Sequence, residues 1–454
     1  MDDDDSVTEE PPYGAAFVPM AIADELVTVP FEPAGEMSGA RGNLVRGSAY
    51  SVVGLVLTGL SGALFWLVAA RLYPSVAVGR ASALFTSVLL VNFLSNLGLP
   101  VALARFGHGP DGDGDVVFTW ALVAMIVASA VAAVVFFLVV DPHAVAAVGG
   151  RSGAAIALFT ALVVGTSMTL LVDVRLMLAR EWRFVLLRMA AVGVVRLPLL
   201  WARPPVADAL WLFVLAAGFP AVSGAVGLFA LRRVAGARFG LRPRPSALGA
   251  FARFAAVNYV ATLAVDAARF VLPVMVLVTV PASANASFYV AWSVAMLIFL
   301  APATIGQVLL VEASRTSTRR SPILAAGSIS VGLMATASIG AWVRADVITS
   351  LFGAGYRPAA EILPRLMAAG VPWAITSVTV ADARVRGDTR STLGITGTLG
   401  LAVLVPAAIL VPEHGIRGAA DAWLGGHLVT AGVSAVLLIR SRVNRPAGAG
   451  ASVP

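Results

Sequence analysis

The sequence contains no lysine and no cysteine, and only four histidines among 454 residues. Without cysteine the chain forms no disulfide and no cysteine-ligated metal site or cluster. The absence of lysine excludes the phosphate-binding loop of ATP-hydrolysing pumps and all Schiff-base chemistry. The four histidines lie far apart in the sequence and form no metal-ligand spacing: His108, His143, His414 and His427. We therefore expect no metal, no ATP and no cofactor.

Charged residues are also scarce, at 13% of the chain, whereas hydrophobic residues make up 59%. An ordinary soluble domain is about one quarter charged. So much apolar surface cannot be hidden in one water-soluble core, and lipid must be the solvent for much of it. The composition predicts an all-α polytopic membrane protein with almost no structure outside the bilayer.

The N-terminal segment has the opposite character from the rest of the chain. Residues 1–40 carry ten acidic residues and no basic one. A signal peptide opens with positive charge, so this segment is not one. We interpret 1–43 as a disordered acidic cytoplasmic tail and 442–454 as a second cytoplasmic tail. The arginines elsewhere gather at membrane boundaries, where lipid headgroups explain them, and we expect no nucleic-acid partner.

Apolar runs long enough to span a bilayer, about 20 residues each, predict about twelve transmembrane helices. They fall near 47–70, 81–104, 116–140, 153–178, 186–202, 207–231, 250–279, 286–311, 323–343, 359–381, 391–411 and 416–439. If both termini are cytoplasmic, arginine is about three times as frequent in the inner loops as in the outer ones. This bias predicts a multi-pass protein of the cytoplasmic membrane with both ends inside.

The two halves of the chain resemble each other. Pro74 and Pro281 precede similar segments, and Asp173 and Asp382 close the fourth and tenth predicted spans at a nearly equal offset. Six spans in each half give both halves the same orientation, so the repeat is parallel, as in transporters whose site lies between halves. The predicted units are a six-helix bundle at 44–232, a basic cytoplasmic linker at 233–247 and a second six-helix bundle at 248–441.

Ionisable side chains inside the membrane mark candidate sites, because each costs several kcal/mol, about 2.5–3.5 on insertion scales, to place in hydrocarbon. On the seventh span, four polar residues fall within a sector of about 80° on one helix face: Asn258, Thr262, Asp266 and Arg269. This stripe lines a substrate cavity, or Asp266 and Arg269 neutralise each other locally and pack two helices.

Two further arginines are candidates for the same cavity. Arg196 lies inside the fifth span with no acidic residue within one helical turn. It faces the cavity or pairs with a carboxylate on another helix. Arg365 lies near the outer end of the tenth span, where it lines the cavity or extends to the interface.

Several segments resemble polysaccharide biosynthesis membrane proteins of the multidrug/oligosaccharidyl-lipid/polysaccharide exporter superfamily. They are "FWLVAARLYPSVAVGRASAL" (65–84), "LSNLGLPVALARF" (94–106), "FYVAWSVAMLIFLAPATIGQVLLVEASR" (288–315) and "LFGAGYRPAAEILPRL" (351–366). The resemblance implies a MATE-like fold of two six-helix bundles around a central cavity. It also implies alternating access and the flipping of a lipid-linked oligosaccharide across the cytoplasmic membrane.

The residues leave several functions open. A flippase would use Arg196 and Arg269 to bind an anionic headgroup, because arginine binds phosphate oxygens bidentately. Asp266 would then position Arg269 or carry a coupling proton or cation. A drug or cation antiporter of the same superfamily could use Asp266 alone. A glycan polymerase or ligase would need an external cluster of catalytic residues, which we do not find, so we expect no enzyme activity; a static scaffold is the last alternative.

Overall fold

The computed structural model describes residues 37–107, 113–139, 150–179, 181–202, 204, 206–233, 239–240, 245–313, 320–385 and 389–443. The greater part of the predicted acidic tail, residues 1–36, and most of the predicted C-terminal tail lie outside this set. In the described part, α-helices are joined by short turns and 3₁₀ segments. A chain of this hydropathy must satisfy its backbone hydrogen bonds internally in lipid, and helices do so within each segment.

The N-terminal half consists of seven helices, with one 3₁₀ turn at Pro198–Trp201. They are α1 (Met37–Leu72), α2 (Ser75–Ser95), α3 (Leu99–Phe106), α4 (Asp113–Val139), α5 (Gly153–Leu178), α6 (Trp182–Val195) and α7 (Asp208–Arg233). The C-terminal half consists of six helices and the 3₁₀ turn η5 at Ala354–Tyr356. They are α8 (Pro245–Thr279), α9 (Ala282–Ala313), α10 (Arg320–Ser350), α11 (Arg357–Ala368), α12 (Gly370–Val385) and α13 (Thr389–Val443).

Helix α13 is a hairpin of two antiparallel arms. Its apolar section of 48 residues would measure about 70 Å as one rod, roughly twice the hydrocarbon thickness. Gly415 breaks the helical backbone with φ 59°. An added Cβ at Gly418 would lie 1.9 Å from the Leu410 carbonyl oxygen, and one at Gly426 would lie 2.3 Å from Val403. The two arms therefore pack face to face, as the separate predicted spans 391–411 and 416–439 require.

Each predicted span coincides with helical residues. Within the described part, eight helices are long and apolar enough to cross a membrane, and the bent helix α8 makes a ninth. That number counts the α13 hairpin once and leaves out the shorter apolar helix Val56–Leu72 within α1. The tenth predicted span corresponds to the short helix α11 followed by α12. The structure thus confirms an all-α protein with many apolar membrane-spanning helices.

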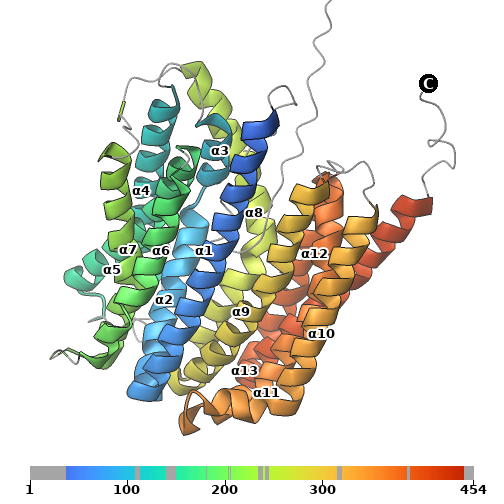
Figure 1. Cartoon of the computed structure of the whole chain (residues 1–454). Helices are drawn as coiled ribbons and strands as arrows, with labels where there is room; N and C mark the ends of the chain where they lie inside the picture. Colours follow the sequence, from blue (N-terminus) through green and yellow to red (C-terminus); the bar gives the residue numbers. More distant parts are fainter. Residues whose placement is uncertain are drawn as a thin grey trace, which may run out of the picture.

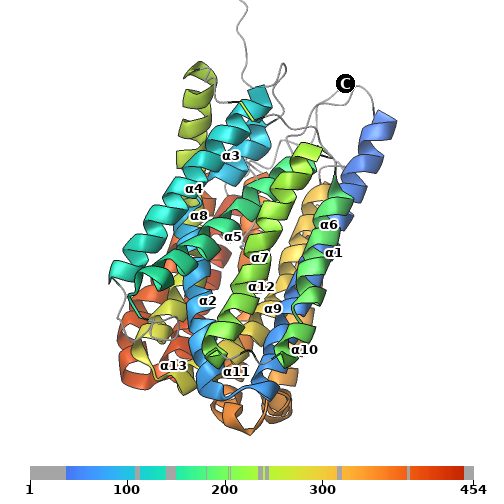
Figure 2. The same cartoon turned by 90° about the vertical axis from the view of Figure 1, so that its left-hand side faces the viewer.

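The two halves lie side by side. Figure 1 shows α2 to α7 gathered on one side and α9 to α13 on the other, with α1 and α8 between them. The start of α1 and the end of α13 lie at the same end of the molecule in both Figure 1 and Figure 2. Helix α11 lies at the opposite end, which we call the outer end because the predicted topology places it outside the cell.

The second predicted span, 81–104, is not one continuous helix. The chain breaks between α2 and α3, where Gly98 adopts φ 69° and its N–H donates to Asn96 Oδ1 at 3.0 Å. A Cβ at Gly98 would lie 2.2 Å from the Ala255 carbonyl oxygen of α8. Tyr259 of α8 also donates its hydroxyl hydrogen to the Leu94 carbonyl at 2.6 Å. The break lets α3 pack directly against the backbone of the other half near the inner end.

Candidate substrate site between the two halves

The predicted polar stripe of α8 lies in the protein interior. Asn258, Thr262 and Asp266 are buried and Arg269 is half-buried. Asn258 Nδ2 donates to the Phe254 carbonyl at 2.8 Å, and Thr262 Oγ1 donates to the Asn258 carbonyl at 2.9 Å. These bonds satisfy both side chains within their own helix. The stripe therefore presents the Asp266 carboxylate and the Arg269 guanidinium as its ionisable groups.

Helix α8 bends at the level of Asp266. The segments Leu248–Ala264 and Asp266–Thr279 meet at 55°. Asp266 and Arg269 each interact with another group. Transporters commonly place binding groups at such interruptions, because a broken helix exposes backbone groups and helix ends to a site.

Arg269 lies beside the contact between α8 and α2. Its guanidinium carbon is 5.3 Å from the centre of the Phe270 ring. Phe270 in turn stacks on Phe93 of α2, with ring centres 4.8 Å apart. Since α2 and α8 belong to different halves, Arg269 lies close to the interface between them.

Arg196 is buried where the two halves meet. It follows the last residue of α6 and is 7% exposed. Its guanidinium carbon lies 4.8 Å from the centre of the Phe65 ring of α1, within the range of a cation–π interaction. It has no ion-pair partner in the described part of the chain, and its Nε atom has no hydrogen-bond partner there. The predicted pairing with a carboxylate on another helix is therefore absent from the described residues.

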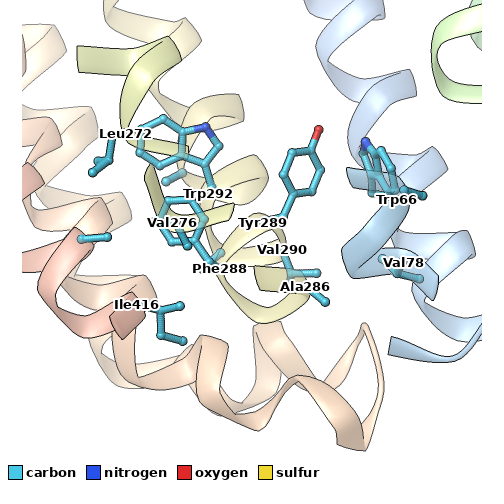
Figure 3. Packing of buried hydrophobic residues seen from close by; sticks show 14 of the residues in the cluster. Trp66, Val78, Leu272, Val276, Ala286, Phe288, Tyr289, Val290, Trp292 and Ile416 are labelled. Carbon is cyan, nitrogen blue, oxygen red and sulfur yellow. The ribbon is translucent and has the colours of Figure 1, made fainter. Parts of the chain in front are cut away.

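The C-terminal half contributes Tyr289 to the surroundings of Arg196. Tyr289 of α9 is buried within electrostatic range of the guanidinium. Its ring lies 4.9 Å from that of Trp66 of α1 in an edge-to-face arrangement, and Figure 3 shows the two side chains pointing toward one another from opposite halves. Trp66 also lies 6.0 Å from Phe85 of α2. The Arg196 guanidinium thus has the Phe65 ring and the Tyr289 side chain as neighbours, one from each half of the chain.

The halves are closed against each other on the outer side of Arg196. Asn285 Nδ2 of α9 donates to the Gly79 carbonyl of α2 at 3.0 Å. A Cβ at Gly79 would lie 1.9 Å from the Ala282 carbonyl oxygen, so α2 and α9 touch backbone to backbone. Arg71 at the end of α1 donates from Nη2 to the Ser350 carbonyl at 3.2 Å and from Nε to the carbonyl of the next residue. We call this set of contacts the outer seal.

Arg365 lies at the outer end of the molecule. It belongs to α11, where its Nε atom pairs with Asp421 of α13 at 2.9 Å. Glu361, one turn earlier, pairs with Arg417 at 2.5 Å. All four side chains are between 43% and 59% exposed, so water screens both pairs. The structure therefore places Arg365 in a surface ion-pair ladder that fixes α11 to α13.

The predicted candidates form three separate groups. Arg196 lies beside Phe65, and the next residue, Trp66, contacts Phe85 of α2. Arg269 lies beside Phe270, which stacks on Phe93 of α2. Phe85 and Phe93 are about 12 Å apart along α2. The two arginines thus border the same interface at different depths, and Arg365 belongs to neither group.

One buried ion pair in the N-terminal half was not predicted from the sequence. Arg188 of α6, which the topology assigns to the cytoplasmic boundary, is buried and pairs with the buried Asp173 of α5. It also donates to the Ser223 hydroxyl of α7. Three helices of one half are thus joined by one guanidinium. The acidic partner lies on another helix, fifteen residues away, so helical spacing does not reveal the pair.

No group of three or more metal-ligating side chains occurs among the described residues. No protein-family model and no curated protein matches the sequence.

Solved structures do match the fold. One is a multidrug resistance MATE family transporter of the MOP superfamily in an inward-facing conformation, with a TM-score of 0.58 and 18% identity over 87% of this chain and 94% of that one. An outward-facing structure of such a transporter gives a TM-score of 0.58 and 17% identity over 91% and 100%. A MOP superfamily transporter from Pyrococcus furiosus gives 0.54 and 17% over 91% and 98%. The chain therefore has a MATE-like fold. At identities of 17–18% this similarity shows the fold alone.

Proposed function

We propose that the protein is a transporter that moves an anionic lipid-linked oligosaccharide across the cytoplasmic membrane by alternating access. The observation that carries the proposal is Arg196, a buried guanidinium at the interface between the halves with no ion-pair partner in the described part of the chain. An uncompensated buried charge is costly and marks a functional site in a membrane protein. Phosphate oxygens of a lipid-linked headgroup would supply the missing negative charge.

The outer seal supports alternating access. A transporter must close one side of its site while the other is open, and the contacts between Gly79, Asn285 and the start of α9 close the outer side. Small residues at such a contact allow helices to approach closely and to separate without breaking large interdigitated surfaces. These contacts would have to separate whenever the site opens to the outside.

A drug or cation antiporter is the second candidate, and the buried carboxylate of Asp266 favours it. The positive charge of Arg196 opposes it, because a cationic substrate would be repelled. The relative from Pyrococcus furiosus is described as having a binding pocket of reverse polarity that suggests a different function. A reversed polarity fits the arginine-bordered interface of this chain, and we give the anionic substrate priority.

The test uses the native host with the gene deleted. We would complement it with wild type, with Arg196→Gln or with Arg344→Gln, an exposed arginine of α10 that serves as the control. Lipid-linked oligosaccharide facing the cytoplasm and glycan at the cell surface are both quantified.

Wild type and Arg344→Gln should restore surface glycan, whereas Arg196→Gln should leave precursor inside with at least a tenfold loss of export. Full rescue by Arg196→Gln would remove Arg196 from the site. Unchanged glycan pools in the deletion strain, with no second transporter present, would refute the proposed substrate.

A further inference from the structure

His427 lies in a closed aromatic cage in the C-terminal half. It is on the second arm of α13 and is 1% exposed. The imidazole is surrounded by Trp423 at 4.2 Å, Trp373 of α12 at 5.8 Å and Phe299 of α9 at 6.0 Å between ring centres. These distances are within the range at which an aromatic ring attracts a cation. Aromatic rings at these distances would offset part of the cost of burying a positively charged imidazolium.

The hydrogen bond of His427 fixes which nitrogen can take up a proton. Nδ1 lies 2.8 Å from the Trp423 carbonyl oxygen. A carbonyl only accepts, so Nδ1 carries the hydrogen and donates it. In the neutral ring the lone pair then belongs to Nε2, which is the acceptor for a second proton.

A stripe of buried polar groups extends from His427 along the same arm. Trp423, His427, Thr430 and Ser434 fall within a sector of about 60° on the helix, and all four are buried. Among the described residues, the Trp423 indole N–H and the Ser434 hydroxyl have no hydrogen-bond partner. His427 and Thr430, between them, bond to backbone carbonyls of the same arm. Buried polar groups are normally paired, so the unpaired group at each end of the stripe calls for an explanation. The stripe runs toward the cytoplasmic end of the arm.

Other charged groups do not explain the cage. In α8, α10 and α11, the carboxylates and guanidiniums are Arg253, Asp266 and Arg269 on α8, Arg357, Glu361 and Arg365 on α11, and Arg320, Arg344 and Asp346 on α10. Arg253 and Arg357 are exposed. Glu361 and Arg365 are committed to surface ion pairs, and Arg344 and Asp346 are exposed. On α9, Tyr289 lies beside Trp66. Glu312 of α9 and Asp382 and Arg384 of α12 lie near the C-terminal ends of their helices, at least nine residues from Phe299 or Trp373. The rings that contact the imidazole carry no ionisable group.

We propose that His427 binds the proton whose movement drives transport, and releases it toward the cytoplasm along Thr430 and Ser434. A proton is the one ligand that a close-packed cluster can accept without a cavity. The proposal rests on the transporter function proposed above but not on its substrate. When the outer seal opens, His427 would be protonated from outside; with the seal closed, the stripe provides the exit.

The first experiment follows protonation directly and needs no substrate. The full-length protein with ¹⁵N-labelled histidine is purified in detergent, and its imidazole signals are followed by NMR from about pH 4 to 8, the range around the ordinary histidine pKa of about 6.5. Tryptophan fluorescence is recorded on the same samples, because an imidazolium in contact with an indole quenches it. The variants are His427→Gln and, as the matched control, His414→Gln, whose side chain is 60% exposed.

The wild type should show an imidazole signal that is lost in His427→Gln and that converts to the imidazolium form as the pH falls, with a parallel loss of fluorescence. His414→Gln should retain both changes. If the wild-type signal stays neutral throughout, or if His427→Gln shows the same fluorescence titration, the proton site is refuted. The wild-type measurement decides the question even if His427→Gln fails to fold.

The second experiment tests coupling in the host. Surface glycan export is measured with and without a protonophore that abolishes the pH gradient. Wild type and His414→Gln should lose export at least tenfold on treatment, while His427→Gln should export poorly with or without the protonophore. Wild-type export by His427→Gln would refute coupling at this residue. A deletion strain without a glycan defect would instead count against the substrate, and the NMR titration would still stand.

Discussion

A methyl group added at Gly79 should open the outer seal. In Gly79→Ala the new Cβ would lie 1.9 Å from the Ala282 carbonyl oxygen, 2.8 Å from the carbonyl carbon and 3.2 Å from the Ala286 Cβ atom. Ordinary van der Waals contact begins at 3.4 Å. The nearest atom is backbone and no rotamer change relieves the clash, so α2 and α9 must separate by about 1.5 Å in a close-packed interface.

The cost of that separation sets the size of the effect. Overpacking of this kind costs about 1–3 kcal/mol. Separation also breaks the hydrogen bond from Asn285 to the Gly79 carbonyl, which contributes about 1 kcal/mol. A penalty of about 2–4 kcal/mol on the closed state alone shifts the equilibrium toward the outward-open state by roughly 30-fold or more. Substrate export should fall, because the return to the inward-facing state becomes unfavourable.

The absence of native cysteine makes the assay simple, since one introduced thiol is the only one in the chain. Thr86 lies two turns inward of Gly79 on the same face of α2 and is buried. Thr86→Cys is labelled in intact cells with a membrane-impermeant maleimide in three backgrounds: the unaltered chain, Gly79→Ala and Gly340→Ala. Gly340 of α10 has nothing within 4 Å of an added Cβ and is the matched control. Equal labelling in all three backgrounds would refute the outer seal; faster labelling with Gly79→Ala alone would support it.

Two further predictions concern stability. Arg188→Met should destabilise the protein by about 3–5 kcal/mol, because it leaves the buried Asp173 carboxylate without its partner, and the double variant Arg188→Met with Asp173→Leu should recover most of the loss. Arg365→Gln should change stability by less than about 1 kcal/mol, since its ion pair with Asp421 is half exposed. Thermal unfolding of the detergent-purified proteins measures all of these. A destabilised double variant, or an Arg365→Gln variant as unstable as Arg188→Met, would contradict the reasoning.

The helices could be predicted because lipid imposes a simple rule. A run of about 20 apolar residues in hydrocarbon has no polar partner for its backbone except itself, so it becomes a helix wherever it is long enough. The same rule predicted 391–411 and 416–439 as two separate spans, and Gly415 forms the turn between them. The break at Gly98 was not predicted, although Gly98 and Pro100 are local signals for it. The packing of Gly98 against the α8 backbone, more than 150 residues away, has no signal in the local sequence.

The side-chain environments could be predicted only where one helix determines them. The stripe from Asn258 to Arg269 needs no information beyond helical periodicity, and its first three members are buried. The cage around His427 takes rings from α9, α12 and α13, so its members are far apart in sequence. The partner of Arg188 and the neighbours of Arg196 likewise come from other helices. Spacing along the chain identifies a polar residue in the membrane but not what lies opposite it.

The distribution of buried charge favours an anionic substrate over a cationic one. In the N-terminal half the buried carboxylate of Asp173 is neutralised by Arg188 within the same bundle, so it offers no negative charge to a ligand. Arg196 remains as a positive charge at the interface between the halves. Arg269 lies three residues after Asp266 on the same helix, so its positive charge offsets the negative potential of the Asp266 carboxylate. A cationic drug would meet at least as much positive as negative charge along this interface, whereas a phosphate group would gain the Arg196 guanidinium, which has no ion-pair partner among the described residues.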